Sequence, residues 1–227
     1  MLQSEAISPE ERALPRFSRR GLKCLPTWDL WHKNELEQLV QMKALGMFGS
    51  PIKLPEGGIL MRFHWQYRIK VNGKRRSRLC CDGSPRAAPE VHSTTYALCL
   101  EHPAFQLFIA LCAADNLTIY GGDAKDAFAH SPGPSMPTFM KLDDVFRDWY
   151  LEHTGVLLDK DLVLPVLRTL QGHPEAARLW EEHISAILEK VEFNSTMHEK
   201  NIYTGRFCGE KVLLVRQVDD FALGCHQ

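Results

Sequence analysis

Two adjacent carboxylates, Asp219 and Asp220, lie between two apolar, β-prone runs near the end of the chain. Asp is disfavoured inside strands, so the pair is predicted to occupy the tight turn of a hairpin. Two negative charges side by side in apolar surroundings are costly without a counterion, and a divalent cation can supply one. A solvated turn explains most isolated Asp-Asp pairs, so this pair alone does not decide between a metal site and an ordinary turn.

A third carboxylate, Asp123, comes just after a short strand predicted over residues 117–120. If the end of that strand lies beside the hairpin turn, three carboxylates meet at adjacent strand ends. Such an oxygen-rich set suits Mg²⁺, a hard cation that prefers oxygen ligands. The sequence therefore favours a magnesium site made from Asp123, Asp219 and Asp220.

A basic segment forms the second candidate site. Residues 59–71 are rich in β-branched and aromatic residues, and Asn72-Gly73 and the run KRRSRLCC follow. Asn-Gly between two strand-like runs predicts a β-hairpin. Because side chains on a strand repeat every two residues, Arg76 and Arg78 are expected to share one face. A basic two-stranded ribbon suits a phosphate backbone or a triphosphate, and a charged edge that prevents aggregation is the alternative.

The distribution of charge agrees with this division between acidic and basic sites. Residues 1–80 contain 15 Lys and Arg against 7 Asp and Glu, a net charge of +8, whereas residues 81–227 carry 12 against 21, a net charge of −9. One part is therefore expected to handle polyanions and the other to place carboxylates. A length of 227 residues, with 44% hydrophobic and 24% charged residues, indicates one large or two small globular domains. These values exclude a disordered chain, a collagen-like repeat and a disulfide miniprotein.

The seven cysteines include no CxxC pair, which predicts reduced thiols in a reducing compartment. Cysteine and histidine also lack the spacing of a tetrahedral zinc site. The first twenty residues contain no apolar stretch that could act as a signal peptide, and the apolar segment 104–114 is too short to span a bilayer. An intracellular protein, cytoplasmic or nuclear, is therefore expected.

Apolar periodicity and capping signals predict the elements that must position these groups. Residues 1–26 are polar and contain three prolines, so they are predicted to form a loose, flexible arm. The remaining elements are helices over residues 27–46, 103–115, 143–153 and 173–192, and strands over residues 162–167, 201–207 and 211–218.

Five segments, taken in order over about residues 28–224, resemble the reverse transcriptase domain of copia-type LTR retrotransposons. Val218-Asp219-Asp220 is similar to the family's Y-V-D-D, with Gln217 in the place of the tyrosine. Asp123-Ala124-Lys125-Asp126-Ala127-Phe128 is similar to D-V-x-x-A-F. The other three segments are Trp31…Glu35 with Met42-Lys43 and Pro51…Pro55, Trp65…Lys70…Gly73…Arg76-Ser77-Arg78-Leu79, and Leu170-Gln171-Gly172…Arg178-Leu179-Trp180.

The resemblance implies an α+β fold of the reverse-transcriptase, right-hand type, in which an antiparallel palm sheet packs on helices. Residues 27–116 would form the fingers and residues 117–227 the palm. The chain ends seven residues after Asp220, so a truncation after this motif, without a thumb, is expected. Weak processivity would follow, because the thumb normally clamps the primer–template duplex.

The resemblance also assigns site residues. Asp123, Asp219 and Asp220 would be catalytic, and with the Ala124 carbonyl they would hold two Mg²⁺ ions, for which Mn²⁺ can substitute. Two such ions help to deprotonate the primer 3′-hydroxyl and stabilise the leaving pyrophosphate. Gln217 and Val218 would lie near the primer end. The deoxynucleotide (dNTP) would contact Lys74, Arg76, Arg78, Asp126, Ala127, Phe128, Gln171 and Gly172.

The implied function is that of an RNA-directed DNA polymerase, a nucleotidyltransferase that extends a primer with dNTPs on an RNA or DNA template. Other segments of a Gag-Pol polyprotein are expected partners, and a cytoplasmic virus-like particle or the nucleus is the expected location. The main alternative is an inactive retroelement remnant or a co-opted nucleic-acid-binding module. A metal-dependent phosphohydrolase is a further alternative, but it leaves the basic hairpin without a role.

Overall fold

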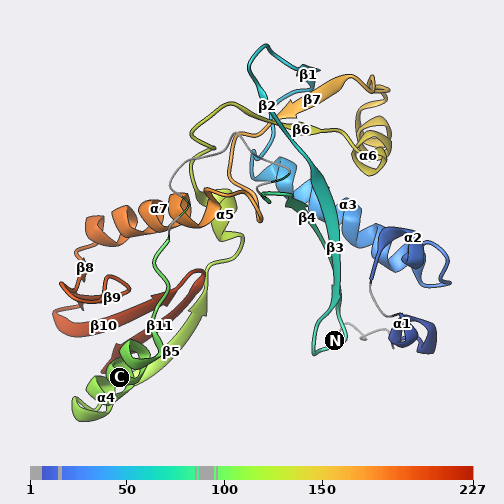
Figure 1. Ribbon diagram of the computed structural model, residues 1–227. Coiled ribbons are helices and arrows are strands. Elements are labelled where there is room, and N and C mark those ends of the chain that lie inside the picture. The colour runs from blue at the N-terminus through green and yellow to red at the C-terminus, as the bar shows by residue number, and fades with distance from the viewer. Residues whose placement is uncertain (1–6, 15–16, 85, 87–94, 96, 227) are drawn as a thin grey trace. The chain divides into compact units, whose positions relative to one another are not determined.

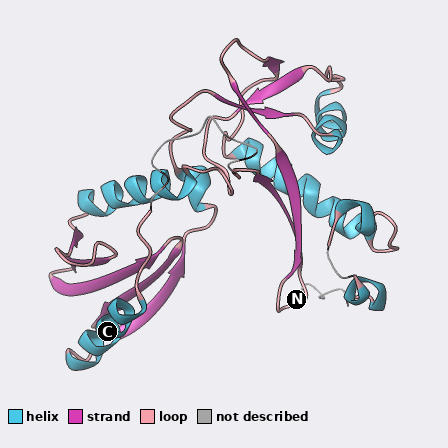
Figure 2. Ribbon diagram, in the orientation of Figure 1, coloured by secondary structure: helices cyan, strands magenta, loops and turns pink. Residues whose placement is uncertain are grey.

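The computed structural model describes residues 7–14, 17–84, 86, 95 and 97–226. The chain divides into two compact units, each of which combines helices with strands (Figures 1 and 2). Unit 1 comprises residues 1–92 and 133–174, and unit 2 comprises residues 93–132 and 175–227. This mixture of helices and sheets agrees with the predicted α+β class. In the described ranges, every helix is too short or too polar to cross a bilayer.

Unit 1 combines helices with a sheet and a separate two-stranded ribbon. Its elements are α1 (Pro9–Ala13), α2 (Arg19–Leu22), α3 (Trp28–Ala44), β1 (Ile52–Lys53), β2 (Ile59–Met61), β3 (Phe63–Ile69), β4 (Arg75–Cys81), β6 (Thr138–Lys141), α6 (Asp144–Thr154) and β7 (Leu162–Pro165). Among the described residues, the sheet has the strand order β1-β7-β6-β2, with β2 parallel to β6 and the other pairs antiparallel. Strands β3 and β4 pair with each other as an antiparallel ribbon.

The ribbon of β3 and β4 has one face toward α3 and one basic face. Tyr67 lies opposite Ser77 on the face that packs against α3. Arg68 lies opposite Arg76 on the other face, because neighbouring residues on a strand point to opposite sides. Gly73 closes the connecting loop with a φ of +79°, a left-handed conformation that glycine adopts without strain. The hairpin predicted from Asn72-Gly73 is therefore confirmed.

The described residues of the predicted loose arm, 7–14 and 17–26, instead contain α1 and α2. Leu22 of α2 is fully buried in one cluster with Trp31 of α3 and Tyr67 of β3. These helices were not predicted because the segment is polar, and its burial depends on hydrogen bonds to distant parts of the chain. Residues 1–6 and 15–16 of the predicted arm lie outside the described residues.

Glu11 is the polar residue that most firmly fixes this segment, and it is fully buried. Arg75 of β4 donates to both carboxylate oxygens, with Nε–Oε1 and Nη2–Oε2 distances of 2.8 Å and 2.7 Å. The Trp31 indole N–H, the Thr27 hydroxyl and the Ser8 backbone N–H donate to the same carboxylate at 2.8, 3.0 and 3.0 Å. The carboxylate is thus satisfied by five donors, which explains how a charged group can be buried here.

Unit 2 is built around an antiparallel sheet. Its elements are α4 (His102–Ala114), β5 (Thr118–Asp123), α5 (Ala127–His130), α7 (Ala176–Lys190), β8 (Asn194–Ser195), β9 (Ile202–Phe207), β10 (Glu210–Gln217) and β11 (Asp220–Cys225). In the described part of unit 2, the strand order is β5-β11-β10-β9-β8, and every neighbouring pair is antiparallel.

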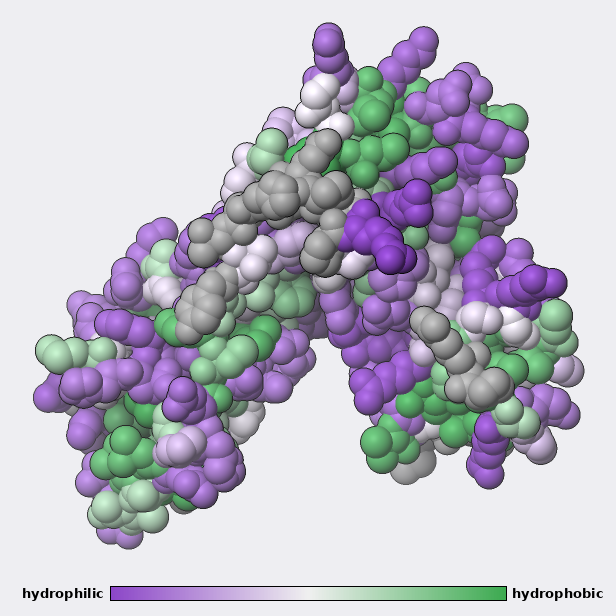
Figure 3. Space-filling model, in the orientation of Figure 1, coloured by the Kyte–Doolittle hydropathy of each residue, from purple (hydrophilic) through white to green (hydrophobic). Residues whose placement is uncertain are grey.

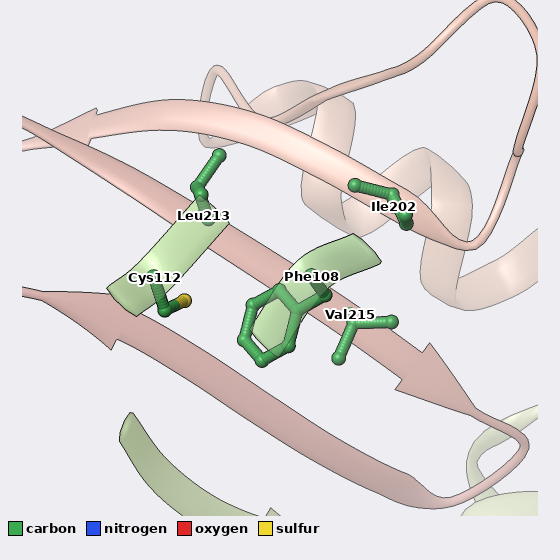
Figure 4. Close-up of a cluster of buried hydrophobic side chains, with 5 residues drawn as sticks. All are labelled: Phe108, Cys112, Ile202, Leu213 and Val215. Carbon is green, nitrogen blue, oxygen red and sulfur yellow. The ribbon is translucent and has the colours of Figure 1, made fainter. Parts of the chain in front are cut away.

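Helices α4 and α7 pack on opposite faces of this sheet. Phe108 and Cys112 of α4 point toward Leu213 and Val215 of β10 (Figure 4). Leu214, which points to the other face, packs in a cluster with Leu188 of α7. Strand β10 is therefore covered on both sides, which explains why residues 212–215 within it form a continuous apolar run rather than an alternating one.

The units do not divide near residue 116, where the sequence predicts the boundary. Helix α4 belongs to unit 2, because Phe108 and Cys112 are part of the core formed with β10. Residues 133–174 belong to unit 1, because β6 within them pairs in parallel with β2. Parallel pairing between segments so far apart in the sequence leaves no local signal, so periodicity could not reveal it.

We expect the stability of unit 1 to depend on pH through Glu11. Burial raises the pKa of this carboxyl, but hydrogen bonds, first from Arg75 and then from Ser8, Trp31 and Thr27, outweigh it and hold the pKa at about 2. The folded pKa is lower than the unfolded one of about 4.3, so this stabilisation is present above that pH. It is lost as the pH falls toward 2.

The measurement is urea unfolding followed by tryptophan fluorescence across this pH range, on the parent chain and on Glu11→Gln. At neutral pH the variant is expected to be less stable by roughly 1–3 kcal/mol, and the gap should close as the pH approaches 2. Curves that stay parallel at all pH values would contradict this account of Glu11.

Candidate functional site

Asp219 lies in the tight turn between β10 and β11. Gln217 pairs with Asp220 across the hairpin, which leaves Val218 and Asp219 as the two turn residues. Val218 has a φ of +57°, an uncommon value for a β-branched residue. The indole N–H of Trp180 on α7 donates to the Val218 carbonyl at 2.7 Å and helps to hold this conformation. The predicted hairpin is therefore present, but only Asp219 lies in its turn, whereas Asp220 is the first residue of β11.

Strand β5 brings a third carboxylate to the same end of the sheet. Asp123 lies directly opposite Asp220 in the antiparallel pair of β5 and β11. The Ala124 backbone N–H donates to the Asp219 carbonyl at 2.7 Å, so the pairing continues into the turn. The structure thus brings Asp123 to the adjacent pair Asp219 and Asp220, from which it is far away in the sequence.

In the described part of the chain, none of these three carboxylates forms an ion pair. Like charges directly opposite each other on paired strands are destabilising, and no described cation forms an ion pair with Asp123, Asp219 or Asp220. Their oxygens are the hard donors that Mg²⁺ prefers. However, among the described residues no group of three or more His, Cys, Asp or Glu side chains is arranged to hold a metal ion. The donor chemistry therefore fits a divalent cation, although the side chains are not assembled as a finished ligand set.

The residues after Asp123 turn sharply into α5. Asp126 has a φ of +56°, and it immediately precedes the helix. Ala127 is buried and Phe128 is half-buried, on a helix that lies against α7. Asp126, Ala127 and Phe128 therefore belong to the same unit as the three carboxylates and follow Asp123 closely in the chain.

The other predicted nucleotide contacts lie in unit 1 and also form a group. The Arg78 guanidinium donates from Nη1 to the Gln171 side-chain oxygen at 2.8 Å, and the Cys81 backbone N–H donates to the Gln171 carbonyl at 2.8 Å. A Cβ on Gly172 would lie 2.2 Å from the Cys81 carbonyl oxygen, so only glycine fits beside β4. Arg76 shares a face of β4 with Arg78, two residues away, and Lys74 lies in the connecting loop just before the strand.

Three contacts around the Asp219 turn were not predicted. The Gln217 side-chain oxygen accepts a hydrogen bond from the Leu100 backbone N–H at 2.7 Å. Arg216 is 2% exposed, and its Nη2 donates to Asn201 Oδ1 at 2.9 Å. An arginine inside the apolar run LLVRQV was a signal that could have drawn attention to Arg216. The third is the hydrogen bond from the Trp180 indole to the Val218 carbonyl, which ties α7 to the turn.

Gly172 provides a test of the contact between its loop and β4. Gly172 and Gly57 both have a positive φ, +86° and +74°, but a Cβ on Gly57 would meet no atom within 4 Å. Gly57→Ala is therefore expected to cost only about 1–2 kcal/mol, the usual penalty for the left-handed conformation. Gly172→Ala adds a clash with backbone atoms and should cost clearly more, with loss of the Arg78–Gln171 contact. Thermal unfolding of both variants measures the difference, and equal costs would contradict the close approach.

A family comparison places the chain among known proteins. Residues 50–227 match the family described as "Reverse transcriptase (RNA-dependent DNA polymerase)". Among curated proteins, none matches the sequence. The matched region contains Asp123, Asp219 and Asp220 and spans most of the chain, so the chain belongs to the reverse transcriptase (RNA-dependent DNA polymerase) family.

Proposed function

We propose that this chain is the RNA-directed DNA polymerase domain of a copia-type retrotransposon, which adds dNTPs to a primer 3′-hydroxyl by phosphoryl transfer. The observation that carries the proposal is the register of β5 and β11, which sets Asp123 opposite Asp220 and next to Asp219. In this proposal unit 2 carries the palm and the β3–β4 ribbon belongs to the fingers. Template and primer, RNA or DNA, are the macromolecular partners, with Gag-Pol segments as further partners.

The carboxylates have a holding and orienting role in this reaction. Asp123 and Asp219, with Asp220 and the Ala124 carbonyl, would hold two Mg²⁺ ions, or Mn²⁺ in their place. Bound there, such ions supply positive charge that favours the ionised hydroxyl and the departing pyrophosphate. The hydrogen bond from Ala124 to Asp219 keeps the two strand ends in register, so the backbone that carries the carboxylates is fixed before substrate binds.

The basic and apolar residues bind the nucleotide. Arg78 has a planar fork that suits phosphate oxygens, and its contact with Gln171 restrains where the fork points. Arg76 lies opposite Arg68, and such a like-charged pair becomes favourable when an anion sits between the two guanidinium groups. Phe128 would lie beneath the deoxyribose and reject a 2′-hydroxyl.

The remaining predicted site residues complete the substrate site. Lys74 and Gly172 would contact the nucleotide from the ribbon and the adjoining loop. The backbone amides of Asp126 and Ala127 would meet its phosphates. Gln217 and Val218 would lie near the primer end, where the Trp180 hydrogen bond fixes the backbone of Val218.

A non-catalytic nucleic-acid-binding module is the second candidate function. The observation in its favour is that the described carboxylates are not assembled as a ligand set for a metal ion. The basic face of the ribbon would bind a phosphate backbone in either case, with an affinity that falls as salt rises. The two functions therefore differ in catalysis rather than in binding.

Replacement of Asp219 by Asn separates the two candidates. It removes the negative charge but keeps the shape of the side chain, so primer extension on an RNA template with Mg²⁺ should fall by at least about a hundredfold while template binding remains. Asp115→Asn is the matched control, because Asp115 is an exposed carboxylate at the end of α4 in the same unit.

The rate of dNTP incorporation is the readout, and a fluorescent primer–template measures binding in parallel. Extension by the parent and by Asp115→Asn, but not by Asp219→Asn, is the expected result. Equal extension by the parent and Asp219→Asn would contradict the proposed role of the carboxylate. Binding without extension by any of the three chains would favour the non-catalytic module.

A further inference from the structure

Two fully buried glutamates connect the N-terminal helices of unit 1 with the β3–β4 ribbon. Glu11 of α1 binds Arg75 of β4 through both carboxylate oxygens. Glu35 of α3 accepts two hydrogen bonds from Arg19 of α2, from Nε at 3.0 Å and Nη2 at 3.2 Å, and one from the hydroxyl of Tyr67 on β3. Each strand of the ribbon is therefore bound to a buried carboxylate.

Trp31 contacts both Glu11 and the middle of β4. Its indole N–H donates to Glu11 at 2.8 Å, and its carbonyl accepts a hydrogen bond from the Ser77 hydroxyl at 3.2 Å. Arg75 and Ser77, two residues apart, are thus both held from the same side of the strand. An isolated two-stranded ribbon is only marginally stable, so these ties matter for its conformation.

Holding one face of β4 determines where the other face points. Arg75 and Ser77 face α1 and α3, so Arg76 and Arg78 must face away from them. Hydrophilic side chains line the ribbon on the surface shown in Figure 3. Without the Glu11 carboxylate, Arg75 would be a buried cation lacking its bidentate partner, and β4 could relieve this by rotating or detaching.

We propose that Glu11 is a positioning residue for nucleotide binding: by holding Arg75, it fixes β4 so that Arg76 and Arg78 are presented to the triphosphate. Glu11 lies outside residues 50–227, the region that matches the family. The contact between Glu11 and Arg75 therefore joins a segment before the matched region to β4 within it. The expected effect on nucleotide binding rests on the proposed polymerase function, whereas the expected loosening of β3 and β4 does not.

The test compares Glu11→Gln with Glu37→Gln in the full chain. Glu37 is exposed on α3, so its replacement makes the same change of charge without breaking a buried contact. In Glu11→Gln the KM for dNTP should rise about tenfold with kcat changed less than about twofold, because an interaction that aligns the nucleotide site is weakened. Amide hydrogen exchange should become faster in β3 and β4 but not in β9 and β10. Glu37→Gln should show neither effect.

The other possible results would contradict the proposal. Faster exchange in the ribbon with an unchanged KM would overturn the role in nucleotide binding and leave Glu11 a purely structural residue. Equal acceleration of exchange in both units, or no acceleration in the ribbon, would contradict the claim that Glu11 holds the ribbon locally. If Glu11→Gln does not fold, Arg75→Lys takes its place, because it keeps the charge but lacks the planar fork.

The same experiment distinguishes failure of this inference from failure of the proposed function. If the parent chain does not extend a primer, the polymerase proposal fails. Hydrogen exchange then tests whether Glu11 holds the ribbon, and unchanged protection of β3 and β4 in Glu11→Gln would overturn the inference.

Discussion

The antiparallel pairing of β5 with β11 is the constraint on which the candidate site depends. This register sets Asp123 opposite Asp220, which costs electrostatic free energy unless a cation is bound. The surrounding structure opposes that repulsion. Helices α4 and α7 pack on opposite faces of the sheet, and the Trp180 hydrogen bond holds the Val218 turn from the α7 side. A sheet fixed in this way can hold the strand ends that carry the carboxylates in register, as the proposed metal site requires.

In unit 1 the alternation of side chains along β4 is as important as the register of β5 and β11 is in unit 2. One face of β4 is held by buried groups, above all the contact between Glu11 and Arg75, and the other face presents Arg76 and Arg78. Neighbouring arginines in one short run thus have opposite roles, one as a structural cation and the next as candidate anion ligands. In unit 2 the same alternation directs neighbouring residues of β10 to the cores under α4 and α7.

Local sequence patterns were sufficient to predict several of these features. The Asn72-Gly73 hairpin, the turn at Asp219 and the helix now seen as α7 each follow from adjacent residues whose propensities agree. The structured N-terminal segment could not be predicted, because the partners of Glu11 include Trp31 and Arg75, 20 and 64 residues away. The parallel pairing of β2 with β6 and the assignment of α4 to unit 2 depend on tertiary packing in the same way. The roles of the individual site residues come from the family resemblance and remain predictions.

The most direct test of this account is where a divalent ion binds. Amide signals of the isotope-labelled full chain, followed by nuclear magnetic resonance during a titration with paramagnetic Mn²⁺, report the residues nearest to the ion. The account predicts that the signals of Asp123, Ala124 and Asp219 broaden first and that Asp219→Asn weakens this effect. Broadening that begins elsewhere, or that is unchanged in Asp219→Asn, would contradict a metal site at the paired ends of β5 and β11.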